Sequence, residues 1–145
     1  MATPEQWTAY LKLLDDLGRT IEKLTAIEQE KTAAVSNHNV SAVDDCMKRE
    51  QALSLSLRGL DQKRQRALSQ MNLQGVNLRG LPDHAPDDLL MDVKAACQTL
   101  QSRYRLFQNA SQVARDTLEC HLRAVEKVME DIPEIDRPPQ ADFRG

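Results

Sequence analysis

Large aromatic rings are scarce in this chain of 145 residues, which has one Trp, two Tyr and two Phe, 3% of the sequence. So few rings favour a thin seam of aliphatic side chains between helices over a thick core that encloses a pocket. Glycine and proline are also few, at five and six residues, whereas 41% of the residues are apolar and 28% are charged. This composition is typical of a helical rather than a disordered protein.

The sequence also lacks the signals of secretion and of membrane insertion. Its N-terminus has no basic stretch followed by an apolar one, and no run of eighteen apolar residues occurs. The three cysteines, Cys46, Cys97 and Cys120, have no C-x-x-C spacing, and two of them lie on apolar seams, where a reduced thiol behaves as a small hydrophobe. The net charge of −3 gives no electrostatic reason to expect a nucleic-acid partner. We therefore expect a cytoplasmic protein without a membrane span.

Motifs for catalysis or for cofactor binding are missing. No Glu is followed by His three residues later, the spacing that di-iron helical bundles need. Gly75 and Gly80 have the separation found in a P-loop, but Leu81 follows where that motif requires Lys. Cys120 and His121 are adjacent, so on a helix they point about 100° apart and cannot both bind one metal without outside ligands. We expect no cofactor, no metal site and no enzyme activity.

Three stretches in which apolar residues recur every three or four positions predict helices over residues 4–35, 42–72 and 87–132. We assign all three to one domain, residues 1–132. Residues 133–145 contain three prolines and mixed charge, so we expect them to form a flexible C-terminal tail.

Residues at the ends of these stretches support the helix bounds. Thr3 and Gln6 can form a capping box at the first helix, and Ser41 can cap the second. A proline and two aspartates at 86–88 suit the first turn of the third helix, and Pro133 cannot continue it. The connection between the second and third helices also carries apolar residues that we expect to cover the end of a bundle: Leu73, Val76, Leu78 and Leu81.

Two charged residues, Glu50 and Arg64, interrupt the apolar stripe of the second helix. We interpret them as polar residues that set the register of packing, or as paired ions, rather than as functional groups.

The third helix is longer than the two before it. At about 1.5 Å per residue, the first two should each span about 47 Å and the third about 69 Å. The short turn near residues 36–41 makes the first two an antiparallel hairpin, and the third should run back along it and overshoot by about 20 Å. The expected fold is therefore all-α, an elongated antiparallel three-helix bundle or coiled coil whose third helix projects from about Leu118.

The projecting end has an apolar face without a predicted partner inside the chain. Large apolar side chains contribute about 1.5–3 kcal/mol each when they leave water, so we expect this face to bind a helix of another protein. Two alternatives stay open: the face folds back on the first helix or on the 36–41 turn, or it pairs in a homodimer. The residues of the face are Leu118, Leu122, Val125, Val128, Met129 and Ile132.

The order of these features resembles a known family. The first helix closes with IEQEKTAAV at 27–35, and after a polar turn comes VDDCMKREQAL at 43–53. Leu57, Leu60 and the basic pair at 63–64 follow, and a third long helix leads to a polar tail. Over nearly its whole length the chain resembles the FlgN-like family of flagellar type III export chaperones.

The resemblance implies a cytoplasmic chaperone that binds helical segments of flagellar hook-associated proteins and prevents their premature assembly before export. In that family the C-terminal part of the last helix carries client binding, which coincides with the face between Leu118 and Ile132. The alternative function is that of a self-associating structural or adaptor coiled-coil protein.

Overall fold

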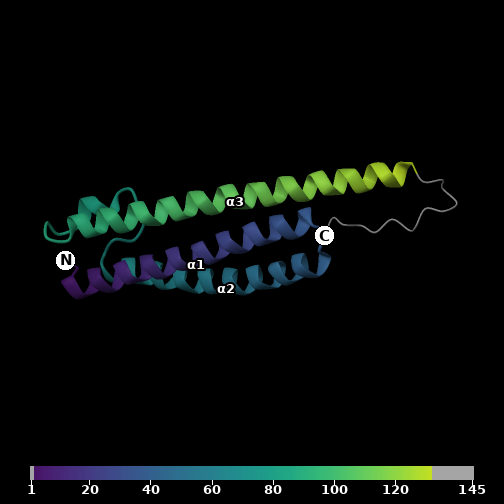
Figure 1. Ribbon diagram of the computed structural model, residues 1–145. Helices are drawn as coiled ribbons and strands as arrows, with labels where there is room; N and C mark the ends of the chain where they lie inside the picture. Colours follow the sequence, from purple (N-terminus) through teal and green to yellow (C-terminus); the bar gives the residue numbers. More distant parts are fainter. Residues whose placement is uncertain (1, 132–145) are drawn as a thin grey trace.

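The computed structural model describes residues 2–131, and all regular structure in that part is helical (Figure 1). Three long helices, α1 (Pro4–Ser36), α2 (Val40–Gln70) and α3 (Leu90–Glu130), are accompanied by a short 3-10 helix, η1 (Leu81–His84). α1 and α2 run antiparallel, whereas α3 lies beside α1 and runs in the same direction as α1. The predicted all-α bundle of three long helices is confirmed.

Local polar contacts cap the starts of α1 and α2. The Thr3 side chain and Gln6 form the predicted capping box at the start of α1. The prediction for α2 was wrong: its cap is Asn39 rather than Ser41, because the Asn39 side chain accepts the backbone N–H of Ala42 at 3.1 Å. α2 therefore begins at Val40.

The connection between α2 and α3 covers the end of the bundle, as expected. Leu81, in η1, is 1% exposed, and Leu73, Val76 and Leu78 pack against the same core. The turn at residues 86–89 does not belong to α3, which begins at Leu90 rather than at residue 87. The chain first places Ala85 and Leu89 against the core and only then enters the helix.

α1 is the central helix of the bundle. Its neighbours α2 and α3 pack on two sides of it, but they nowhere bring their Cα atoms within 8 Å of each other, although both are described over their full length. The third side of the bundle is therefore open. The largest buried side chains gather at the end closed by the connection: Trp7, Tyr10 and Leu14 of α1, Leu81 of η1 and Val93 of α3.

A polar contact fixes α3 to one flank of α1. The Arg103 side chain lies across α1 at Gly18, where an ideal Cβ atom would come within 2.5 Å of Arg103 Nη1. From this position the Arg103 guanidinium reaches Glu22 at 2.8 Å and Asp15 at 3.6 Å. The missing side chain at Gly18 thus permits the ion pairs that hold α3 in place.

The charged residues on the α2 stripe are paired, as the sequence indicated. Glu50 lies 2.8 Å from Lys31 of α1, which also contacts Glu28 at 3.3 Å. Arg64 pairs with Asp61 at 2.8 Å and donates a hydrogen bond to the Tyr10 hydroxyl at 3.5 Å. Glu50 and Arg64 therefore serve the packing of α2 on α1.

Candidate functional site

α3 continues past the turn that joins α1 and α2 (Figure 1). The rings of His38, in that turn, and His121, on α3, pack edge to face with centroids 4.9 Å apart, which marks the level at which the hairpin ends. His121 thus lies level with the end of the hairpin, three residues beyond Leu118, where the projection was expected to begin. We call residues 118–131 the projecting part of α3; its first residue, Leu118, lies just before this level. The difference has the same size as the shift in the start of α3, from residue 87 to Leu90.

The projecting part of α3 carries a row of exposed apolar side chains on one face. Most of the predicted residues lie there, whereas Ile132 falls outside the described residues. Met129 is half-buried. The exposed fractions of the others are 44% for Leu118, 37% for Leu122, 58% for Val125 and 62% for Val128.

This row continues the face that α3 packs on α1. Ala114 of α3 is buried at 2% exposure, and steps of four, four and three residues lead from it to Leu118, Leu122 and Val125. Such steps keep the side chains on one side of a helix. α1 ends at Ser36, so a helix that covered the row would take the place of a longer α1.

The opposite face of the projecting part is charged. Residues 118–131 contain four carboxylates and two cations, a formal charge of −2. Arg123 and Glu119 lie 3.8 Å apart and are both largely exposed, so this pair contributes little to stability. The face opposite the apolar row is thus charged and exposed to solvent, as expected for a helix that binds through one face.

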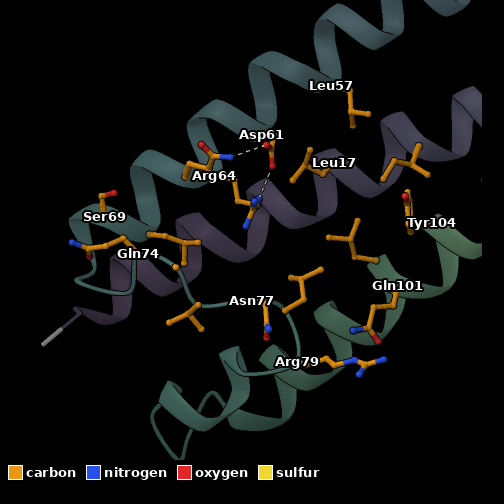
Figure 2. Close-up of a pocket in the computed structure, with 17 residues that line it drawn as sticks. Leu17, Leu57, Asp61, Arg64, Ser69, Gln74, Asn77, Arg79, Gln101 and Tyr104 are labelled. Carbon is orange, nitrogen blue, oxygen red and sulfur yellow. Dashed lines mark hydrogen bonds and ion pairs between the residues drawn. The ribbon is translucent and has the colours of Figure 1, made fainter.

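A second feature, a groove, lies between α2 and α3 on the open side of the bundle (Figure 2). It has a volume of about 1060 Å³, and it is lined by Leu17 and Ile21 of α1 and by residues of both neighbouring helices. Sequence reasoning did not find this groove. Tyr104 follows Leu100 by four residues, the spacing of the apolar seam of α3, but nothing in this spacing indicates that Tyr104 faces an open groove.

The comparison with protein families settles which family these features represent. The model of the FlgN protein family matches residues 1–133. The chain belongs to the FlgN family. The resemblance read from the 27–35 and 43–53 segments is thereby confirmed. No curated protein and no solved structure matches the chain significantly.

FlgN proteins are export chaperones of the flagellum, a family of binding proteins rather than of enzymes. Within the described part of this FlgN chain, no helix is long and apolar enough to cross a membrane. The match includes the whole described part, and with it the projecting end of α3 and the groove between α2 and α3.

The thiols of this FlgN chain have structural surroundings. Cys46 and Cys97 are buried, and burial raises the pKa of both thiols, which keeps them protonated. Cys120 is exposed on α3. Among residues 2–131, no three His, Cys, Asp or Glu side chains lie close enough together to hold a metal ion.

Proposed function

We propose that this chain is a cytoplasmic chaperone that binds helical segments of flagellar hook-associated proteins and prevents their assembly before type III export. The binding site is the apolar row of α3 formed by Leu118, Leu122, Val125, Val128 and Met129, with Ile132 beyond it. The observation that carries the proposal is the continuity of this row with the face that α3 packs on α1.

A client helix would bind as a second α1. The face of α3 that accepts α1 as far as Ala114 continues to Val125 in steps of four, four and three residues, so it presents an apolar stripe to an outside helix. The turn around His38 limits how far such a helix reaches toward the hairpin. The client therefore lies end to end with α1, along α3.

The size of the row is suited to reversible binding. Five side chains that each contribute about 1.5–3 kcal/mol give a gross gain of about 7.5–15 kcal/mol. Association itself costs about 4–15 kcal/mol, so the net affinity is moderate. A client held in this way cannot present the same apolar face to another copy of itself, and it is released at the export gate without covalent chemistry or nucleotide hydrolysis.

The proposal is tested with Leu122→Asp combined with Val125→Asp. Two carboxylates on the row should abolish co-purification with hook-associated proteins, because binding would bury unpaired charges. Both side chains are exposed, so circular dichroism should show unchanged helix content.

A matched control replaces two other exposed apolar residues, Leu55→Asp with Met91→Asp, which lie on α2 and at the start of α3. This control should bind clients like the wild type. If the clients still co-purify with the Leu122→Asp, Val125→Asp variant, the binding site lies elsewhere.

A further inference from the structure

One flank of the apolar row on α3 is acidic. The central residues of the row advance in alternating steps of four and three residues, as in a heptad repeat: Leu118, Leu122, Val125 and Met129. Leu118 and Val125 occupy the d positions of this repeat, so Glu119 and Glu126 occupy the e positions directly beside the row. These two carboxylates are seven residues apart and therefore lie on the same side of the helix.

The cations of the projecting part lie away from the row. Arg123 and Lys127 come two residues before and two residues after Val125, which places them about 160° from it around the helix. The g positions on the other flank, His121 and Val128, carry no carboxylate. The carboxylates directly beside the row therefore lie on one flank, and no Lys or Arg lies between them and the row.

The two carboxylates of this flank can pair with a bound helix. Both side chains are exposed. Glu119 lies 3.8 Å from Arg123, but a pair this exposed contributes little, and Glu126 forms no ion pair with any described residue. In helical coiled coils, charges at the e and g positions decide which partner binds. The acidic flank thus favours a helix with Lys or Arg beside its apolar stripe.

The contacts between α1 and α3 have the opposite sense. There α3 supplies the cation, Arg103, and α1 supplies Glu22 at 2.8 Å and Asp15 at 3.6 Å. Residues 4–36 of α1 contain six carboxylates and four cations, a formal charge of −2. A client helix that lies end to end with α1 would be repelled by the acidic flank if it had the charge of α1. The client therefore continues the packing of α1 but not its charge.

We propose that the clients of this chain bind the row through an amphipathic helix that carries Lys or Arg along one side of its apolar stripe. This inference rests on the proposed function and adds to it the charge of the helix that is bound. The apolar row supplies the contact area, and Glu119 and Glu126 select among apolar helices by charge. Because both carboxylates are exposed, this selection weakens as salt is raised.

The test uses the full chain and two designed, fluorescently labelled peptides of about three heptads, with Leu at the a and d positions. One peptide carries Lys at every e and g position and the other carries Glu there, so like charges keep each peptide from pairing with itself. In fluorescence anisotropy at low salt, the Lys peptide should bind at least about fivefold more tightly than the Glu peptide. The ratio should fall as salt is raised. Equal binding of the two peptides, tighter binding of the Glu peptide, or no binding of either would overturn the proposal.

Charge reversal locates the selection. Glu119→Lys with Glu126→Lys should invert the preference, so that the Glu peptide binds more tightly than the Lys peptide. The matched control, Asp87→Lys with Asp116→Lys, changes the net charge of the chain by the same amount at two exposed positions. Asp87 lies in the turn before α3, and Asp116 lies nine residues before Val125, on the opposite face of the helix. The control should still prefer the Lys peptide; equal effects of the two double variants would show a response to net charge alone and would contradict the proposal.

Failure of this inference can be distinguished from failure of the proposed function. Leu122→Gln with Val125→Gln removes apolar contacts of the row without adding charge, and it should abolish binding of the Lys peptide. If the wild type binds both peptides equally and this variant binds neither, the row binds helices without selecting their charge. The inference is then wrong, although the client proposal stands. The client proposal itself fails only if hook-associated proteins still co-purify with the Leu122→Asp, Val125→Asp variant.

Discussion

Gly18 lies in the middle of α1, where alanine would normally stabilise a helix by about 1 kcal/mol relative to glycine. The Arg103 side chain fills the space that a Cβ atom would take there. An alanine at residue 18 must therefore displace Arg103 from its ion pairs with Asp15 and Glu22. The gain in helix propensity and the loss of these contacts oppose each other.

Gly18→Ala should consequently change the free energy of unfolding by less than about 0.5 kcal/mol, but it should stabilise the Arg103→Ala variant by about 1 kcal/mol. Urea denaturation of the four proteins of this cycle measures the difference. Gly59→Ala is the control, since nothing lies within 4 Å of a Cβ atom at that exposed position on α2; it should gain about 0.5–1 kcal/mol in either background. A full gain from Gly18→Ala in the wild type would show that the Arg103 side chain does not occupy the space of the added Cβ atom.

Glu28 is a second residue whose surroundings have a measurable consequence. Its side chain is buried between α1 and α2, and burial, followed by the neighbouring carboxyl of Glu50, raises the pKa of Glu28 above the usual 4.5. Lys31 opposes this effect only in part. Because the folded state holds the Glu28 proton more tightly than the unfolded chain, the stability from this group is fully present below pH 4.5 and is lost as pH rises through the raised pKa.

Glu28→Gln should therefore increase the free energy of unfolding at pH 8, and this gain should shrink as the pH is lowered toward 4.5. Glu30→Gln is the matched control with the opposite sign. A hydrogen bond from Arg49 lowers the pKa of Glu30, so the stability from Glu30 is present above its usual pKa and is lost as pH falls through the lowered one. Urea titrations at several pH values measure the free energy of unfolding of both variants. A loss of stability from Glu28→Gln at pH 8 would contradict a raised pKa of Glu28.

At the scale of whole helices, the start of α2 shows what a short pattern leaves undecided. Both Asn39 and Ser41 are good capping residues, and each precedes a stretch with helical periodicity. His38 adopts a φ of 57°, which brings the chain around in fewer residues than expected and lets Asn39 cap. The left-handed conformation of one residue therefore decides where the helix begins.

Asn39→Ala should accordingly lower the free energy of unfolding by about 1 kcal/mol, because the N–H of Ala42 loses its partner. Ser41→Ala, two residues further on, should have little effect, since that side chain is exposed within the first turn of α2. Thermal or urea denaturation compares the two variants. Equal losses would show that the cap is shared between the two side chains.

The long helices themselves were predictable from the sequence. The apolar residues of α1, from Trp7 to Leu24, recur at three and four positions, and they are the residues that the fold buries. The start of α3 was not predictable to the residue, because Asp87 and Asp88 suit a helix start as well as the turn that they form. The same displacement of three residues places His121, rather than Leu118, level with the end of the hairpin.

At the scale of the whole molecule, heptad patterns show which face of a helix is apolar but not which helices meet. Leu57 and Leu100 would be apolar in a closed bundle and are equally so beside an open groove. The arrangement is decided by contacts that no short pattern contains, such as Arg103 reaching over Gly18 to Glu22. The projecting end could be predicted because it depends only on helix lengths, whereas the groove between α2 and α3 depends on this arrangement.

Charge on the projecting end also bears on whether the chain pairs with itself. In a symmetric dimer through the apolar row, residues 118–131 of one copy, with a formal charge of −2, would face the same residues of the other copy. The gross gain of the row is similar in size to the cost of association, so this repulsion disfavours the dimer at low salt.

We therefore expect light scattering at low salt to find a monomer whose mass does not change with protein concentration, and a heavier complex only when a hook-associated protein is added. The Leu122→Asp, Val125→Asp variant should remain monomeric in both cases. A concentration-independent dimer of the wild type that this variant dissociates would instead favour the self-associating coiled coil, because the apolar row would then have its partner in a second copy of the chain.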